Sequence, residues 1–185
     1  MTSSLWLRTL TTCHSTRAYD PMFTFTSHAE ADTECLGAGL AEVLPAGCVV
    51  GLFGALGAGK TRLVQAVARG MGVAAGVVTS PTFVLLHQYL QGRLPIYHFD
   101  AYRLHDDDEF LELGPEEYFS AGGITLIEWA ERVSRCLPTE RLEIRIEAGG
   151  ANERTFFLAA TCAELEGPLV RLQAILGRGK EVFRG

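Results

Sequence analysis

The sequence lacks the excess of basic residues that is typical of proteins whose main activity is to hold nucleic acid through their own electrostatic field. Its 185 residues include 16 Lys and Arg against 22 Asp and Glu, which gives a formal net charge of -6. We therefore do not expect this protein to bind nucleic acid directly. A phosphate site stays open to such a chain, because backbone N–H groups of a glycine-rich loop bind phosphate without basic side chains.

Closely spaced cysteines and long apolar runs are also missing. The five cysteines are odd in number, lie far apart and form no C-x-x-C pair. This pattern argues against a zinc cluster and against a secreted disulfide framework, so we expect reduced thiols and a cytoplasmic location. The most apolar stretch, 48–58, is short and interrupted by glycine, so no membrane-spanning segment is expected.

The composition is that of one folded domain, with 48% hydrophobic and 21% charged residues. We assign residues 22–166 to this domain. Residues 1–21 are expected to be a disordered leader, such as a transit segment, or a start assigned too early, with Met22 as the true beginning. Residues 167–185 are expected to form a closing amphipathic helix on Leu169, Leu172, Ile175 and Leu176, with a frayed basic end.

Apolar runs and helical periodicities alternate along the domain. The runs at 48–53, 96–99 and 124–127 are typical of buried parallel strands. One helix is expected within 27–44 and a second at 61–72. A C-terminal hairpin should pair 142–146 with 155–159. These features predict an α/β sheet with helices on both faces and an antiparallel addition. Further local predictions are a capping box at Ser27 and Glu30, extended segments at 77–80 and 83–89, and a helix opened by the acids 106–109.

Three of the 20 glycines, Gly54, Gly57 and Gly59, lie close together directly after the first of these strands. The segment fits the phosphate-loop (P-loop) pattern G-x-x-x-x-G-K-[ST], with a strand before it and a helix after it. Glycines let successive N–H groups face phosphate oxygens, Lys60 can reach the β- and γ-phosphates, and the Thr61 hydroxyl can coordinate Mg²⁺. The expected nucleotide-binding residues are Gly54, Ala55, Leu56, Gly57, Ala58, Gly59, Lys60 and Thr61.

A P-loop needs an acid at the end of another strand to hold magnesium. Asp100 and Glu128 both follow apolar runs, so at least one of them is expected to hold the magnesium ion. Considered separately, each could instead be an ordinary solvent-exposed acid at a strand end. The guanine-reading N-K-x-D pattern is absent because Asn152 is the only asparagine, and no D-x-x-G occurs. The sequence therefore favours ATP, with Mg²⁺, over GTP.

Several residues near these acids have both a functional and a purely structural interpretation. Ser80-Pro81-Thr82 is placed to form a switch-like loop over the γ-phosphate, or an ordinary turn. His98 shares a strand face with Asp100, although a strand histidine is more often packed than catalytic. Taken alone, Trp129 is by default a core residue.

Four segments together resemble one family, the TsaE (YjeE-type) ATPases of bacterial tRNA threonylcarbamoyladenosine biosynthesis. The matching segments are Gly57–Thr61, Ser80–Phe83, Tyr97–Leu104 and Ile127–Trp129, and the likeness runs over about 25–160. The P-loop alone is generic. The H-F-D-x-Y-R-L segment followed at this distance by I-E-W is specific.

The resemblance implies an ATP- and Mg²⁺-dependent ATPase that works with two transferase-related subunits and meets tRNA indirectly through them. ATP hydrolysis would support turnover of this complex. It implies that Lys60 holds phosphates and that Thr61 and Glu128 ligate magnesium. Asp100 would lie near the γ-phosphate or its attacking water. The resemblance further implies that Ser80 and Thr82 belong to the switch-like loop. It implies that Trp129 contributes to the nucleotide pocket or to its coupling to partners, and that His98, Tyr102 and Arg103 lie in the functional region.

One departure from the resemblance lies in the P-loop, where Ala55 stands at a position that is usually aspartate in the family. We expect ATP binding to survive this change and hydrolysis to be slower. Two other functions stay open from the residues alone. One is a small-molecule P-loop kinase with a lid of arginines, for which Arg132, Arg135 and Arg141 are available. The other is a nucleotide-gated binding module with little hydrolysis.

Overall fold

The computed structural model describes the backbone of residues 23–182 and the side chains of residues 23–177. The segment predicted as a leader or an early start, 1–21, lies outside the described residues. So do the side chains of the basic C-terminal end. The predictions about both ends, and the division into domains, stay predictions.

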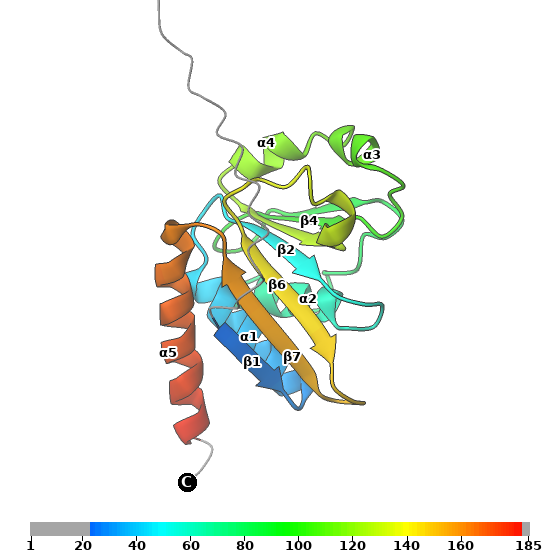
Figure 1. Ribbon diagram of the computed structural model, residues 1–185. Helices are drawn as coiled ribbons and strands as arrows, with labels where there is room; N and C mark the ends of the chain where they lie inside the picture. The colour runs from blue at the N-terminus through cyan, green and yellow to red at the C-terminus, as the bar shows by residue number, and fades with distance from the viewer. Residues whose placement is uncertain (1–22, 183–185) are drawn as a thin grey trace, which may run out of the picture.

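Seven strands form one mixed sheet in the order β1-β7-β6-β2-β5-β4-β3 (Figure 1). Strands β6, β2, β5 and β4 are parallel, and β3, β7 and β1 add antiparallel at the edges. Every residue of β2, β4 and β5 is buried, as expected of parallel strands covered on both faces. The strands are β1 (Phe23–Ser27), β2 (Val49–Phe53), β3 (Leu86–Tyr89), β4 (Ile96–Asp100), β5 (Ile124–Glu128), β6 (Leu142–Ala148) and β7 (Arg154–Ala160). The predicted hairpin is confirmed as β6–β7.

Helices cover both faces of the sheet, as the sequence predicts. The first face carries α1 (Glu30–Val43), α2 (Lys60–Gly70) and α5 (Glu166–Val182), which follows the short helix η2 (Ala163–Leu165). The second face carries α3 (Asp107–Leu111), α4 (Pro115–Ser120) and the short helix η1 (Ala130–Val133). Each face has its own hydrophobic core. On the first face, Leu169, Leu172 and Leu176 of α5 are buried.

Helices α1 and α2 pack closely because small residues face each other. A Cβ added at Gly37 would lie 2.3 Å from Cβ of Ala66, and one added at Gly70 would lie 2.7 Å from Cβ of Ala41. These distances are too short for any side chain. The contact therefore holds the middle and the end of α2, the helix that follows the P-loop, against α1.

The strand order brings the candidate site residues to one edge of the sheet. Strand β2 lies between β5 and β6, and β5 lies between β2 and β4. Since these strands are parallel, their carboxyl ends meet at the same edge. Glu128 is in register with Leu52 of β2 on one side and with Asp100 of β4 on the other. The P-loop and both predicted acids thus lie together.

The predicted capping box at Ser27 and Glu30 is wrong. Ser27 is still the last residue of β1 and pairs with Arg154 of β7, so its backbone is not free to cap a helix. Helix α1 begins after Ala29, and the carboxylate of Asp32 accepts a hydrogen bond from the Ala29 N–H at 3.1 Å.

The prediction of an extended segment over 83–89 is correct only for its second part. Strand β3 covers Leu86–Tyr89, whereas the residues before it form a turn in which the N–H groups of Val84 and Leu85 donate to the Pro81 carbonyl. The φ of Leu85 is 66°, which is not extended backbone, so the strand begins only after it. The segment 77–80 lies in no strand of the described part.

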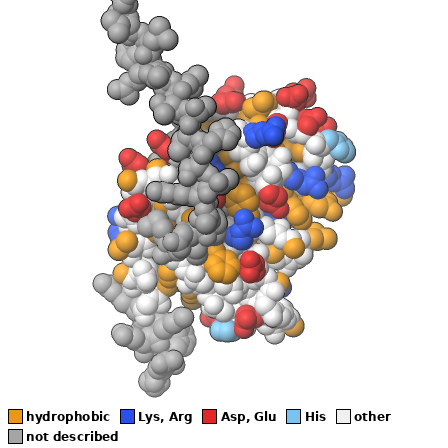
Figure 2. Space-filling view, in the orientation of Figure 1, with side chains coloured by type: hydrophobic (Ala, Val, Ile, Leu, Met, Phe, Trp, Pro, Cys, Tyr) orange, Lys and Arg blue, Asp and Glu red, His pale blue; other side chains and the backbone are white. Residues whose placement is uncertain are grey.

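The surface carries both signs of charge. Figure 2 shows acidic side chains over the end of the molecule where α3 and α4 lie in Figure 1. Within residues 23–182, no helix combines the length and apolar character needed to cross a membrane. The cysteines of the described part, Cys35, Cys48, Cys136 and Cys162, are free thiols.

Candidate functional site

The P-loop joins β2 to α2 with a backbone that only glycine adopts readily. Gly54, Gly57 and Gly59 have φ angles of 145°, 76° and 108°. Gly54 also lies against β6, because a Cβ there would come 2.5 Å from the carbonyl oxygen of Ile146. The loop is therefore shaped by both backbone conformation and close packing, and it leads into the N-terminus of α2, where free N–H groups favour anions.

Lys60 is buried at the start of α2, with its side chain folded over the loop. Its Nζ donates to the carbonyl oxygens of Gly54 at 2.6 Å and Ala55 at 3.1 Å. The ammonium also lies 3.5 Å from the centroid of the Trp129 ring, a cation–π contact. Burial lowers the pKa of Lys60 from its ordinary value, and the negative charges of Glu131, Glu128 and Asp100 oppose this shift. A phosphate at the loop would supply a stronger counter-charge.

Glu128 connects the P-loop to the interior of the sheet. Its Oε2 accepts a hydrogen bond of 2.9 Å from the Thr61 hydroxyl, and its Oε1 lies 2.8 Å from Nε2 of His98. Glu128 is 2% exposed and His98 is fully buried. The structure thus gives His98 a defined contact at the site, which the sequence alone does not assign.

Asp100 is held by a separate set of donors. The hydroxyls of Ser80 and Thr82 both donate to its Oδ2, at 2.7 and 2.6 Å, and the Tyr102 N–H donates to its Oδ1 at 2.9 Å. Asp100 is 2% exposed. The predicted switch-like segment is therefore tied directly to the carboxylate at the end of β4.

Trp129 forms one wall of the site in a strained conformation. Its φ is 59°, in the left-handed region that a bulky residue rarely adopts and that costs about 1–3 kcal/mol. The turn directs the chain away from β5 immediately after Glu128. Its ring contacts the Tyr102 ring at a centroid distance of 4.8 Å. Trp129 thus lines the site and also packs against the core of the second face.

These groups surround one cavity of about 280 Å³. It brings together most of the residues that the sequence singles out, including Tyr102 from the functional region, and it adds Arg62. Gly54 and Ala55 do not line it, although their carbonyls hold Lys60. Ala58 lines a neighbouring cavity instead. The predicted residues in the cavity wall are Leu56, Gly57, Gly59, Lys60, Thr61, Ser80, Thr82, Asp100, Glu128 and Trp129.

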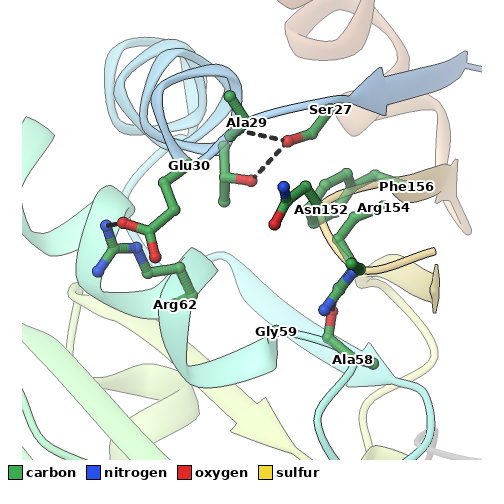
Figure 3. Close-up of a pocket in the computed structure, with 11 residues that line it drawn as sticks. Ser27, Ala29, Glu30, Ala58, Gly59, Arg62, Asn152, Arg154 and Phe156 are labelled. Carbon is green, nitrogen blue, oxygen red and sulfur yellow. Dashed lines mark hydrogen bonds and ion pairs between the residues drawn. The ribbon is translucent and has the colours of Figure 1, made fainter. Parts of the chain in front are cut away.

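A second cavity, of about 230 Å³, lies on the other side of the P-loop (Figure 3). Gly59 and Arg62 line both cavities. Figure 3 shows Glu30 and Arg62 on one side and Asn152 and Arg154 on the other. Its lining residues are Ser27, Ala29, Glu30, Thr33, Ala58, Gly59, Arg62, Ala151, Asn152, Arg154 and Phe156.

Arg154 is one of the residues of this second cavity that sequence reasoning misses. Its Nε donates to the carbonyl of Ala58 at 3.1 Å, and its Nη2 contacts that of Gly57 at 3.5 Å. The partners are 96 and 97 positions apart. No local sequence pattern predicts such a contact. The one available indication is that Arg154 begins the strand after the predicted hairpin turn.

Comparison with known proteins identifies the family. Residues 27–156 match the family described as Threonylcarbamoyl adenosine biosynthesis protein TsaE. The chain belongs to the TsaE family. The TsaE resemblance seen in the sequence motifs is thereby confirmed.

Individual TsaE relatives match most of the folded part. The tRNA threonylcarbamoyladenosine biosynthesis protein TsaE of Bacillus subtilis is 44% identical over 114 residues, covering 62% of this chain and 70% of that protein. The protein of the same name from Treponema pallidum is 42% identical over 131 residues, covering 70% of this chain and 96% of that protein. These names do not favour the small-molecule kinase alternative.

A solved structure has a similar fold. The crystal structure of Bacillus subtilis YdiB matches with a TM-score of 0.72 and 32% sequence identity, covering 82% of this chain and 94% of that one. The predicted α/β fold class, with its P-loop-type sheet, is confirmed.

Proposed function

We propose that the protein is an ATP-hydrolysing subunit of the machinery that makes N6-threonylcarbamoyladenosine next to the tRNA anticodon, with hydrolysis supporting turnover of that machinery. One observation supports the ATPase part: the P-loop residues Lys60 and Thr61 line a single cavity together with Asp100 and Glu128. The family and the names of the relatives support the pathway.

The triphosphate is proposed to lie in the 280 Å³ cavity, along the P-loop. Backbone N–H groups at the N-terminus of α2 bind the phosphate oxygens, and Lys60 exchanges its contacts with the loop carbonyls for the β- and γ-phosphates. This exchange suits a buried ammonium, since a phosphate anion provides the charge that two carbonyls provide only partly.

The oxygen groups at the site fit magnesium. Mg²⁺ prefers hard oxygen ligands and is commonly bound by one or two carboxylates together with substrate phosphates. The Thr61 hydroxyl and the Glu128 carboxylate, already 2.9 Å apart, are the proposed ligands. When bound, the ion would neutralise charge that develops on the phosphate oxygens. Residues 23–177 contain no cluster of three or more His, Cys, Asp or Glu that would form an all-protein cage.

Asp100 is proposed to orient the attacking water and accept its proton. Its Oδ2 already accepts two hydroxyl hydrogen bonds, whereas Oδ1 accepts one from the Tyr102 N–H. Each carboxylate oxygen has two lone pairs, so Oδ1 keeps one for water. Water then adds to the γ-phosphorus and the bond to the β-γ bridging oxygen breaks, giving ADP and phosphate.

The nucleoside is proposed to occupy the second cavity. This cavity adjoins the first at Gly59 and Arg62, so one extended nucleotide can lie in both. The Asn152 amide offers a donor and an acceptor to a base, and Phe156 offers apolar surface. Arg154 fixes the wall by holding the loop carbonyls.

The partners are proposed to be the two transferase-related subunits of the modification complex, with tRNA held mainly by them. The net charge of -6 and the acidic side chains over α3 and α4 support an indirect role for tRNA. A cytoplasmic location is proposed from the free thiols of the described part.

The pathway assignment is tested in cells that carry only the Lys60→Ala variant. Loss of the phosphate-binding ammonium should abolish ATP binding, so tRNA nucleoside analysis by mass spectrometry should show loss of N6-threonylcarbamoyladenosine. Normal modification, with the variant as the sole copy, contradicts the proposal.

Single-turnover assays with the purified partners separate the remaining functions. Release of free phosphate supports the ATPase, and phosphorylation of a compound in a nucleoside panel indicates a kinase. Tight ATP binding without hydrolysis, with or without partners, indicates a nucleotide-gated binding module, the alternative that Ala55 keeps open.

A further inference from the structure

We propose that His98 is a positioning residue that orients the carboxylate of Glu128 toward the metal side of the site. The inference rests on the proposed function, because it concerns how Glu128 acts as a magnesium ligand. Its basis is the division of the two Glu128 oxygens between different partners. Oε1 faces the imidazole of His98 in the sheet interior, and Oε2 faces the Thr61 hydroxyl at the P-loop.

The location of His98 makes its polar contact specific. It lies in the middle of β4, opposite Leu126 of β5 and His87 of β3, and its side chain is fully buried. The Tyr89 ring lies beside it at a centroid distance of 6.4 Å. Its other ring nitrogen, Nδ1, is buried without a hydrogen-bond partner among the described residues. Among the described residues, Glu128 is therefore the one hydrogen-bond partner of the His98 ring.

Packing by itself does not account for an imidazole at this position. A buried polar group costs free energy unless it is hydrogen-bonded, so an apolar residue would fill the same space at lower cost. A carboxylate can only accept, so the hydrogen in the His98–Glu128 contact is on Nε2. The ring is a donor placed behind the carboxylate, on the side away from the cavity.

This donor restricts the carboxylate to one orientation. With Oε1 held at 2.8 Å, the plane of the group is fixed and Oε2 is presented at the cavity beside Thr61. Without the donor, the Thr61 hydroxyl is the remaining contact that orients the carboxylate, and Oε1 is left buried without the His98 donor. Removal of such supporting groups commonly weakens metal binding by about 10–100-fold.

The test compares His98→Gln with His98→Asn. Glutamine carries an N–H donor about as far from Cα as Nε2 of histidine, whereas the donor of asparagine is one bond closer to the backbone. Both remove the ring and both are polar. His87→Asn is the matched control, since His87 faces His98 across the β3–β4 pair and its Nδ1 contacts Tyr89 rather than Glu128. Thermal unfolding shows that each variant is folded.

The readout is calorimetric binding of a non-hydrolysable ATP analogue, measured in EDTA and over a series of Mg²⁺ concentrations. We expect His98→Asn to raise the Mg²⁺ concentration needed for half of the affinity gain by about tenfold or more. His98→Gln should stay within about threefold of the unsubstituted chain, and His87→Asn should match it. Affinity in EDTA should be equal in all four, because the P-loop contacts are unchanged.

Two results overturn the inference while leaving the proposed function intact. One is an unchanged Mg²⁺ requirement in folded His98→Asn. The other is an equal loss in His98→Gln and His98→Asn, which would reduce His98 to a packing role. If the unsubstituted chain binds the analogue with no response to Mg²⁺, the magnesium role of Glu128 fails, and the inference about His98 fails with it.

Discussion

Asp100 and Glu128 are register partners on neighbouring parallel strands, yet their carboxylates bind to different parts of the molecule. Glu128 contacts the P-loop through Thr61, and Asp100 contacts the 80–82 segment through Ser80 and Thr82. Two acids at adjacent strand ends therefore have separate hydrogen-bond partners. This separation leads to distinct expectations for their variants.

Glu128→Ala should spare most nucleotide binding and remove hydrolysis. The P-loop backbone and Lys60 remain, so affinity for ATP in EDTA should change by no more than about threefold. Loss of the proposed metal ligand should lower the single-turnover rate by about 100-fold or more. Glu112→Ala, at an exposed acid, is the control and should keep the full rate. A Glu128→Ala variant with normal hydrolysis would refute this role.

Asp100→Asn should lower the hydrolysis rate strongly but measurably, and its effect should not add to that of its neighbours. Ser80→Ala or Thr82→Ala alone leaves one hydroxyl on Oδ2, so each should lower the rate only about 2–10-fold. In the Asp100→Asn background the Ser80 change should have no further effect, because both act through the same carboxylate. Rates from a double-mutant cycle check this; full additivity contradicts it.

Gly37→Ala should destabilise the fold by about 1–3 kcal/mol, since its methyl group would clash with Ala66 across the α1–α2 contact. Gly177→Ala is the matched control. Gly177 lies in helix α5 with open space around its Cα, so alanine there should stabilise by about 0.5–1 kcal/mol. Urea unfolding measures both. Equal effects of the two substitutions would show that the close contact is absent in solution.

Cys48 should make stability fall at alkaline pH. Burial, aided by the nearby Cys162 thiol, raises the pKa of Cys48 from 9.0 to about 12. Between these values the unfolded chain loses the thiol proton and the folded chain keeps it. The stabilisation is thus complete below pH 9 and declines by about 1.4 kcal/mol per pH unit above it.

Urea unfolding at pH 8 and pH 10 measures this decline. Cys48→Val should show a shallower pH dependence than the unsubstituted chain, by about 1 kcal/mol over this range. Cys35→Ser is the control, because Cys35 is exposed. Identical pH dependence in the Cys48→Val variant would rule out the buried neutral thiol.

The sequence predicts the four parallel strands, the hairpin and most of the first cavity, because each depends on a local pattern; it does not predict β1. The P-loop, the apolar run before Glu128 and the one before Asp100 are all recognisable within a few residues. Arg154 and the second cavity depend instead on β7 lying beside the P-loop, which follows from strand order. The cap of α1 is mispredicted for a related reason: sheet pairing holds Ser27, and no pattern near Ser27 reveals its partner strand.

The position of Trp129 over Lys60 gives the protein an intrinsic optical reporter. Indole emission responds to a charge at its face, and the ammonium lies 3.5 Å from the ring centroid. The chain has one other tryptophan, Trp6, so a Trp6→Phe background would leave a single emitter at the P-loop. In that background, any movement of Lys60 toward a phosphate becomes a change in fluorescence, and the arrival and departure of nucleotide can be followed in real time without a label.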